Sequence, residues 1–533
     1  MIRSPRELDL RLRNLRPVGE FDEVEAGVDL LLRHRQGRVV IAGDFDADGA
    51  TGAALLSLCL ADFGFESVDV FIPDRFELGY GLTPEAVEQI RQRSPTLIVT
   101  VDNGVTSVAG TEAARDSGMD VLITDHHLPG PELPRANAIV NPNLHGNAFG
   151  GKSLAGVGVA FYLMAALGKR LGMAGQVARY LDLAAIGTMA DMVKLDRSNR
   201  ILIEQGLARI RAGLCRPGVI ALCQVAKIPH EAITASRLAY QIAPRLNAAG
   251  RLEDMRVGVR CLMTESGEEA LELANRLNEL NLERRAIGAR MDAEALEHLN
   301  ADKLVDSRAL PAVICLFQDN WHEGLVGLVA SRIMKQFHRP AFAFAPSDSG
   351  ALKGSGRSVR GFHLRDALVD VDAASPGLMS RFGGHAMAAG LTLRREGFAE
   401  FRTAMVALGA ERLGPEHFAE RVFTDGELQS DDLTLEVAAL LRDAGPWGQG
   451  FPEPLFEGSF RLIRQKVVAD AHLKMTVAAA GSGIQLDAIA FNRPSGDWRP
   501  GDRLRLAYRL DVNEYFVTPS VQLVVEHIRP HNS

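Results

Sequence analysis

The chain has 533 residues, a formal net charge of −8 at neutral pH and 47% hydrophobic residues. This length exceeds what one hydrophobic core supports, so we expect several domains, and the composition is ordinary for a soluble globular protein. The net negative charge gives no sign of a polyanion-binding protein, although basic residues lining a single groove would suffice for one. The five cysteines are scattered and include no CxxC pair, which argues against disulfides and thiolate zinc sites and favours the reducing cytoplasm. The N-terminus lacks the apolar segment of a signal peptide, and the most apolar stretch, residues 157–167, is too short for a membrane span.

Strand and helix patterns alternate over roughly the first 260 residues. Residues 38–43 predict a buried strand and residues 50–61 the helix that follows it. Residues 97–101 and 121–124 repeat the strand pattern. Such alternation is typical of a parallel sheet covered by helices.

A single long helix is predicted for residues 268–300, where apolar residues recur at three- and four-residue steps and the other faces are charged. Periodicity alone leaves open whether this helix lies within one domain or bridges two. A second α/β region follows it, starting with a strand at residues 312–317 and containing two glycine-rich segments.

The last part of the chain predicts short strands separated by Gly, Pro and Asp turns, at residues 460–468, 474–479, 485–491 and 503–510. Short strands at even spacing are typical of a small barrel or sandwich. Several aromatic side chains there could stack on nucleobases, although filling the core is their more common role: Phe456, Phe491, Tyr508, Tyr515 and Phe516.

Acidic and imidazole side chains follow three of the predicted strands. The set consists of Asp44, Asp46 and Asp48 in the first cluster, Asp102 in the second, His126 and His127 in the third, and a late Asp191 within an apolar helix. Because the carboxyl ends of parallel strands lie at one edge of a sheet, these groups are expected to converge. Carboxylate oxygens and imidazole nitrogen suit Mn²⁺ or Mg²⁺, and two ions about 4 Å apart could activate a water for attack on a phosphoester.

Each motif also has an ordinary interpretation. The DxDxDG pattern resembles a calcium loop, but the glutamate that an EF-hand needs six residues after Gly49 is replaced by Leu55. A single Asp at a strand end is usually a turn or helix-cap residue, and a pair of histidines is usually structural. The presence of all these acidic and histidine motifs in this order makes coincidence improbable.

The motifs DFDADG, VDNG and TDHH, followed by Asp191, resemble those of the DHH phosphoesterases. The resemblance implies metal ligands at Asp46, Asp48, Asp102, His126 and Asp191, with Asp44 bordering the cluster and His127 beside it or facing phosphate. The chain departs from the pyrophosphatase branch of this family, which has a histidine where Ala42 stands here. Asp44 is a candidate to replace that histidine in part.

Later motifs resemble those of the RecJ branch of single-stranded-DNA-specific 5′→3′ exonucleases: APRLNAAGR, WHEGLVG, GSGRS, GGHAMAAG and GPWGQGFPEPLF. The resemblance implies substrate contacts at Arg245, Asn247, Arg251, His322, Ser355, Arg357, Ser358, Gly383, Gly384 and His385. Arginine forks suit phosphate, and glycine allows a backbone to approach it closely. Which arginines and serines hold a 5′-phosphate stays open, since each arginine could equally form a salt bridge and His322 could simply pack beside Trp321.

The resemblance implies an α/β protein with a parallel-sheet catalytic domain at residues 1–265, a connecting helix at 266–300, a second α/β domain at 301–422 and an OB-fold barrel at 423–533. It also implies a monomeric, cytoplasmic repair and recombination nuclease with two Mn²⁺ or Mg²⁺ ions, acting on single-stranded DNA, with a single-strand-binding protein or a helicase as candidate partners. Two rivals remain: a phosphodiesterase acting on short oligonucleotides or cyclic dinucleotides, and a non-catalytic DHH-like scaffold. The length and the barrel argue against the first, and the intact acidic motifs argue against the second.

Overall fold

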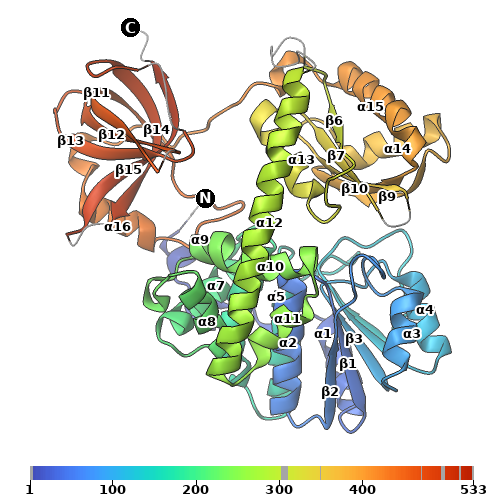
Figure 1. Ribbon diagram of the computed structural model, residues 1–533. Coiled ribbons are helices and arrows are strands. Elements are labelled where there is room, and N and C mark those ends of the chain that lie inside the picture. The colour runs from blue at the N-terminus through green and yellow to red at the C-terminus, as the bar shows by residue number, and fades with distance from the viewer. Residues whose placement is uncertain are drawn as a thin grey trace. The chain divides into compact units, whose positions relative to one another are not determined.

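A computed structural model describes residues 4–301, 310–347, 350–469, 471–493, 498–514 and 518–530. The chain divides into two compact units. Unit 1 comprises residues 1–247, 255–275 and 422–533, and unit 2 comprises residues 248–254 and 276–421. The predicted fold class is confirmed: a parallel-sheet domain, a long helix, a second α/β domain and a barrel follow one another along the chain (Figure 1).

Unit 1 begins with a five-stranded parallel sheet in the order β2-β1-β3-β4-β5. Its strands are β1 (Arg38–Gly43), β2 (Ser67–Phe71), β3 (Leu97–Val101), β4 (Asp120–Thr124) and β5 (Ala138–Val140). The strands predicted at residues 38–43 and 97–101 are confirmed residue for residue, and β4 begins one residue earlier than expected. Their β-branched side chains are buried because helices cover both faces of the sheet.

One face of this sheet packs against α3 (Pro84–Arg91) and α4 (Val108–Asp116). The helices α1 (Glu23–Arg33), α2 (Ala47–Asp62) and α5 (Gly156–Arg170) pack on the sheet as well, away from α3 and α4 (Figure 1). The apolar run at residues 157–167 is thus the buried helix α5. None of the described helices combines the length and the apolarity needed to cross a bilayer.

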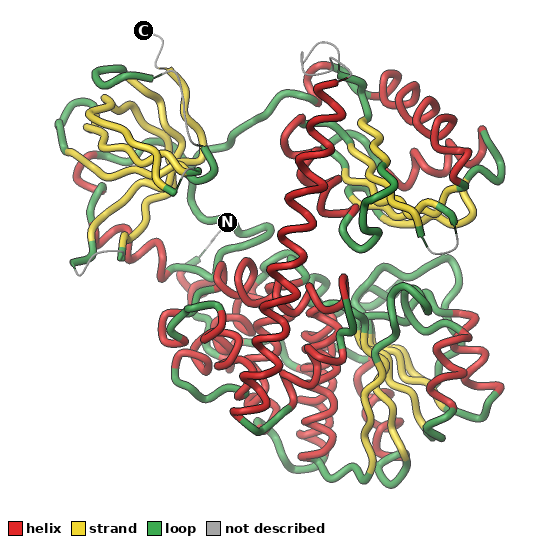
Figure 2. The backbone as a smooth tube through the Cα atoms, viewed as in Figure 1, coloured by secondary structure: helices red, strands yellow, loops and turns green. Residues whose placement is uncertain are grey.

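The prediction that strands and helices alternate to about residue 260 is wrong after Val140. From there to the long helix the described elements of this region are helical (Figure 2). They include α6 (Leu181–Ala190), α7 (Arg197–Arg211), α8 (Pro217–Val225), α9 (Ala235–Arg237), α10 (Ala243–Leu252) and α11 (Arg256–Met263). Their Ala- and Leu-rich faces bury one another, so this part of the core is helix on helix.

The predicted long helix is α12 (Gly267–Ala301), and the chain passes from unit 1 to unit 2 within it. Buried residues occur along its whole length, from Ala270 to Leu299. The bridging interpretation of the helix therefore fits better than that of a helix confined to one domain.

Unit 2 contains a five-stranded sheet in the order β6-β7-β8-β10-β9, parallel between β6 and β7 and antiparallel elsewhere. The strands are β6 (Ile314–Phe317), β7 (Ala341–Pro346), β8 (Leu352–Arg357), β9 (Met379–Gly384) and β10 (Ala388–Leu393). One face carries α13 (Val326–Phe337). The other buries Phe342 and Phe344 against α14 (Leu364–Ala374) and α15 (Phe398–Arg412).

The C-terminal strands form a closed barrel in the order β11-β12-β13-β15-β14. They are β11 (Phe456–Val468), β12 (His472–Ala479), β13 (Gln485–Ala490), β14 (Arg503–Asn513) and β15 (Ser520–Pro530), preceded by α16 (Leu435–Asp443). The alternative of a sandwich is excluded, and β15 was not predicted at all. Of the five aromatic residues, Tyr508 fills the barrel core and Phe456 packs against it. Phe491 is 54% exposed and could stack on a base. Tyr515 and Phe516 lie outside the described residues.

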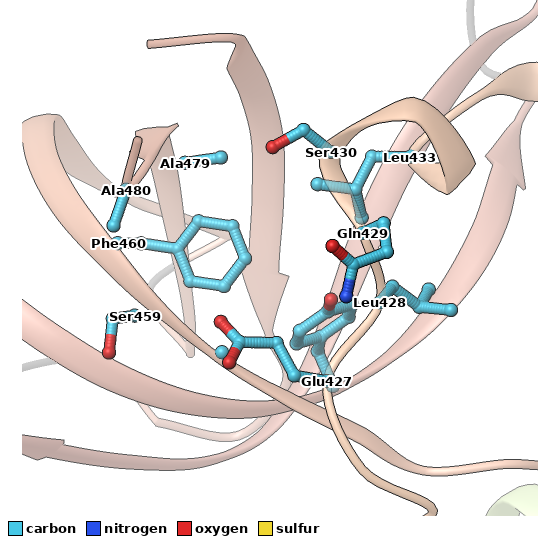
Figure 3. A pocket seen from close by; sticks show the side chains of 11 residues that line it. Glu427, Leu428, Gln429, Ser430, Leu433, Ser459, Phe460, Ala479 and Ala480 are labelled. Carbon is cyan, nitrogen blue, oxygen red and sulfur yellow. The ribbon is translucent and has the colours of Figure 1, made fainter. Parts of the chain in front are cut away.

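A pocket of about 240 Å³ opens on this barrel (Figure 3). Glu427, Gln429 and Ser430 line it from the segment before α16, and the ring of Phe460 lines it from β11. No residue of the predicted metal site contributes to its lining.

Candidate metal centre and phosphate-binding surface

The first acidic cluster lies where β1 leads into α2. Asp46 is the N-cap of α2, and its Oδ1 accepts hydrogen bonds from the backbone N–H groups of Asp48 (2.9 Å) and Gly49 (3.0 Å). The Asp48 carboxylate accepts from the first residues of α5, at 2.7 Å from Gly156 N and 2.9 Å from Val157 N. Two helix N-termini, each carrying partial positive charge, therefore hold these two acids in place.

Asp102 follows β3 in a left-handed backbone conformation, with φ of 63°. Its carboxylate reaches the start of α5 because residue 156 is glycine: a Cβ there would lie 2.5 Å from Asp102 Cβ. Asn and Asp tolerate this conformation better than other non-glycine residues, which explains why an acidic ligand can occupy the tight turn.

Asp125 organises the histidine pair that follows β4. Its Oδ1 accepts from the backbone N–H of His126 (2.7 Å) and of His127 (3.1 Å) and lies 2.8 Å from His127 Nδ1, while Oδ2 accepts from Val105 N at 2.9 Å. Burial alone would raise the pKa of Asp125, but the hydrogen bond and charge of His127 lower it. Asp125 in turn outweighs the effect of burial on His127 and raises its pKa to about 9.

Asp191 is the residue just after α6, not a residue inside the helix as predicted. The helix ends there because Met192 turns the chain with φ of 57°.

His126 Nε2 lies 3.5 Å from Asp191 Oδ2 and 3.0 Å from Asp102 Oδ1. The side chains form three overlapping groups, and within each group the ligand atoms lie within 4.8 Å of one another. The groups are Asp48, His126 and Asp191; Asp102, His126 and His127; and Asp44, Asp46 and Asp102. The structure thus brings together all seven side chains predicted for this site.

The carboxylates of this cluster repel one another in a nearly dry environment. Burial raises the pKa of Asp44, Asp48, Asp102 and Asp191, and neighbouring carboxylates raise each of them further. Burial lowers the pKa of His126, which leaves its ring neutral and able to coordinate a metal. So many buried acids without matching cations are stable only if protons or metal ions compensate them.

Polar atoms with no partner point to a cation. Among the described residues, Asp44 Oδ1, Asp102 Oδ1 and His126 Nε2 are buried and have no hydrogen-bond partner. His126 Nε2 and Asp102 Oδ1 approach to 3.0 Å without the alignment of a hydrogen bond. Two ligands of one octahedral ion lie about this far apart, given metal–oxygen distances of about 2.1 Å. The oxygen-rich donor set with one imidazole fits Mn²⁺ or Mg²⁺.

Three further residues border the centre: Tyr80 and Arg75, which no sequence pattern indicated, and Phe45, which lies inside the DFDADG motif but was given no role. Tyr80 donates a hydrogen bond to the Asp102 carbonyl (3.2 Å) and lies 3.3 Å from His127 Nδ1. Its ring meets Phe45 edge-on, and the guanidinium of Arg75 stands 4.8 Å from the centre of the Phe45 ring. Tyr80 and Arg75 belong to the loop between β2 and α3, whose position depends on tertiary packing, so spacing in the sequence could not find them.

A second group of predicted residues gathers in unit 2 on one face of the sheet. Ser355 on β8, Gly390 on β10 and Gly383 on β9 are direct neighbours across the three strands, so the two glycine-rich motifs adjoin. Arg357 Nη1 donates to Ser355 Oγ (3.0 Å). A Cβ at Gly327, in the first turn of α13, would lie 3.0 Å from Ser355 Oγ and 3.1 Å from an Arg357 Nη atom. An arginine, a hydroxyl and a helix N-terminus together make an anion-binding surface.

The other residues predicted to contact substrate form hydrogen bonds within their own units. In unit 2, Arg251 donates to the Gly324 carbonyl (3.1 Å), and His322 Nδ1 accepts from Gly324 N (3.1 Å), which places both beside the loop that leads into α13. The hydroxyl of Ser358 is buried and donates to the Phe362 carbonyl at 2.6 Å.

Gly384 has φ of 138°, and His385 N donates to Ala388 O (2.8 Å) in the turn after it. In unit 1, Asn247 Oδ1 accepts from Ala47 N (2.9 Å), so this side chain supports the acidic loop. Arg245 donates to the Gln241 carbonyl.

Curated relatives match nearly the whole chain. The single-stranded-DNA-specific exonuclease RecJ of Escherichia coli is 49% identical over 99% of this chain and 94% of its own length. The chain belongs to the RecJ family. The RecJ exonucleases of Haemophilus influenzae and Dickeya dadantii are 45% and 50% identical over the same shares of both chains.

Family models and solved structures support the RecJ assignment along the chain. The DHH family N-terminal domain matches residues 38–188, the DHHA1 domain residues 310–408 and the RecJ OB domain residues 424–527. The structure of RecJ from Thermus thermophilus in complex with Mn²⁺ has a TM-score of 0.83 at 30% identity, covering 99% of this chain and 74% of that chain. A structure of exonuclease RecJ bound to manganese has a TM-score of 0.64 at 34% identity, covering 74% of this chain and 96% of that one.

Proposed function

We propose that the protein is a metal-dependent exonuclease that degrades single-stranded DNA from the 5′ end and releases 5′-mononucleotides, in DNA repair and recombination. The observation that carries this proposal is the buried cluster of acids and imidazoles, with its unpartnered Asp44, Asp102 and His126 atoms. Membership of the RecJ family supplies the substrate class.

The side chains of Asp46, Asp48, Asp102, His126 and Asp191 would hold Mn²⁺ or Mg²⁺, and the three overlapping ligand groups favour two ions, with Asp44 at the border. Bound ions would polarise the scissile phosphate and favour ionisation of the attacking water. The protein fixes its acids by backbone hydrogen bonds before substrate arrives, so little reorganisation is needed. The His127 ring, 2.8 Å from Asp125 Oδ1, lies close to the ligand atoms of Asp102 and His126, where it can donate a hydrogen bond to a phosphate oxygen.

The anion-binding surface of unit 2 is proposed to hold phosphate of the DNA strand, including its 5′ end. Ser355 and Arg357 face the first turn of α13, and the neighbouring Gly383 leaves room for a backbone phosphate. Arg251 and His322 lie beside the loop into the same helix. We favour Ser355 over Ser358, because the Ser358 hydroxyl is already used inside the domain. For Arg245, Gly384 and His385 a substrate contact stays a prediction.

A degradation assay with long DNA labelled at either end tests the proposal. We expect Mn²⁺- or Mg²⁺-dependent loss of the 5′ label as a mononucleotide from single-stranded DNA, and little from blunt duplex. Loss of activity on chelation and its return with Mn²⁺ are part of the expected result. Activity that survives chelation, or release that starts at the 3′ end, would rule the proposal out.

The same assay separates the short-substrate rival, since an enzyme for dinucleotides would cleave them far faster than a long strand. We further propose that the protein acts as a monomer in the cytoplasm, with a single-strand-binding protein or a helicase as partner. Sedimentation of the purified chain at micromolar concentration tests the oligomeric state, and a dimer would contradict it.

A further inference from the structure

The turn formed by residues 447–451, just before the barrel, packs on both sides of Asp191. The Leu195 N–H donates to the Gln449 carbonyl at 2.7 Å. A Cβ at Gly448 would lie 2.7 Å from Leu195 Cδ1 and 3.8 Å from Met189 Cε, so a larger residue there would displace the Leu195 side chain. Met189 precedes Asp191 on α6 and Leu195 follows it in the loop to α7. A single turn therefore touches the chain before and after one predicted metal ligand.

The turn is itself rigid and doubly anchored. Gly448 and Phe451 exchange two backbone hydrogen bonds, of 2.9 and 3.0 Å. The rings of Trp447 and Phe451 stack at 4.9 Å, and the guanidinium of Arg200, on α7, stands 4.2 Å from the centre of the Phe451 ring. Trp447 Nε1 donates to the Leu441 carbonyl of α16 at 3.0 Å. The stack thus connects α7 of the catalytic domain with the helix that leads into the barrel.

Asp191 depends on such support more than Asp46 and Asp48 do. The carboxylates of Asp46 and Asp48 each accept two backbone hydrogen bonds. Within the described residues, the Asp191 carboxylate accepts no such bond; its Oδ2 lies 3.5 Å from His126 Nε2, and one of its oxygens lies within 4.8 Å of an Asp48 oxygen. Its position is set by the α6–α7 loop, where Met192 is 59% exposed and so packs little.

We propose that the turn at residues 447–451 is a positioning device for Asp191, through which the metal affinity of the catalytic domain depends on the docked barrel. The inference rests on the proposed metal centre. Trp447, Gly448 and Phe451 act through the α6–α7 loop and touch no substrate.

Titration of the 533-residue protein with Mn²⁺, with free ion read from its electron paramagnetic resonance signal, tests this inference. We expect Trp447→Ala to weaken Mn²⁺ binding about tenfold, the lower range for loss of groups that support a metal ligand. Because the defect lies in ion affinity, a higher Mn²⁺ concentration should restore the cleavage rate. Gly448→Ala, whose added methyl pushes on Leu195, should act in the same direction and decides the matter if Trp447→Ala does not fold.

Two controls separate positioning from general destabilisation. Trp498→Ala removes a tryptophan that packs against the barrel core, and Gly267→Ala adds a methyl that meets no described atom within 4 Å. Both should bind Mn²⁺ as the wild type does, even if Trp498→Ala lowers the melting temperature. Wild-type affinity in Trp447→Ala and Gly448→Ala, or an equal loss in Trp498→Ala, would overturn the inference. A wild-type protein that binds no Mn²⁺ would instead overturn the proposed function.

Discussion

The metal centre of unit 1 and the anion-binding surface of unit 2 differ in charge and in burial. The first collects buried carboxylates whose pKa values rise through burial and mutual repulsion. The second presents Ser355 and Arg357, partly exposed, beside a helix N-terminus and open glycine positions. A buried cluster of like charges stores unfavourable energy that a cation releases, whereas a half-exposed arginine costs little to maintain without its ligand.

Because of this difference, mutations in the two regions should have different effects on catalysis, ion binding and stability. Removing one charge from the metal centre should slow catalysis greatly and yet relieve repulsion in the ion-free protein. Removing the arginine from the anion-binding surface should leave ion binding and stability nearly unchanged and alter the choice of substrate end. Three predictions test this contrast.

The largest effect is expected for Asp102→Asn. Asparagine keeps the shape and tolerates φ of 63°, so the variant should fold. Loss of a ligand removes several kcal/mol of transition-state stabilisation, or about a thousandfold in rate. In the absence of divalent ions the variant should melt at or above the temperature of the wild type, because repulsion with Asp48 is gone. Asp116→Asn, an exposed acid on α4, is the matched control and should change neither quantity. A variant that cleaves normally would break the contrast.

A smaller and more selective effect is expected for Arg357→Ala. Charge-assisted hydrogen bonds to phosphate contribute about 1.5–3 kcal/mol, so degradation of 5′-phosphorylated DNA should slow by about ten- to a hundredfold in kcat/KM. DNA with a 5′-hydroxyl should be affected much less, and Mn²⁺ affinity should not change. Arg402→Ala, on α15 at the opposite face of the same sheet, serves as control. Equal losses on both kinds of DNA end would contradict the assignment.

The smallest effect is a pH-dependent stabilisation by metal. The raised pKa values of Asp48, Asp102 and Asp191 mean that the folded protein binds protons more tightly than the unfolded chain does. The contribution of these groups to stability is complete below the unfolded pKa of about 4 and is lost as pH rises through their folded pKa values. Mn²⁺ replaces the protons, so its stabilising effect should grow from pH 5 to pH 8. At a hundred times its Kd an ion adds about 2.7 kcal/mol, or a few degrees in melting temperature. A metal-induced shift that is equal at both pH values would contradict this account.

Much of the catalytic sheet could be predicted from sequence because its signals are local. The buried strands β1 and β3 are short β-branched runs, and each ends at an acid of the site. The convergence of Asp46, Asp102 and His126 followed from the rule that parallel strands share a carboxyl edge.

Other features depend on contacts between distant residues and could not be predicted. The support that Asn247 gives to the acidic loop is one such feature, because its Oδ1 accepts a bond from Ala47 N, 200 residues earlier. Tyr80 approaches Asp102 through a loop without a motif. The helical region after Val140 was mistaken for further sheet because short apolar runs fit buried strands and buried helices alike.

If the buried acids hold divalent ions that drive hydrolysis, ion binding and activity must rise together in a parallel titration. Mn²⁺ is added stepwise to metal-free protein, and bound ion and the rate of mononucleotide release from 5′-labelled single-stranded DNA are measured on the same sample. We predict about two ions bound per chain, a rate that rises in step with occupancy, and weakened binding in Asp102→Asn. A full rate before any ion is bound, or unchanged binding in Asp102→Asn, would contradict the account.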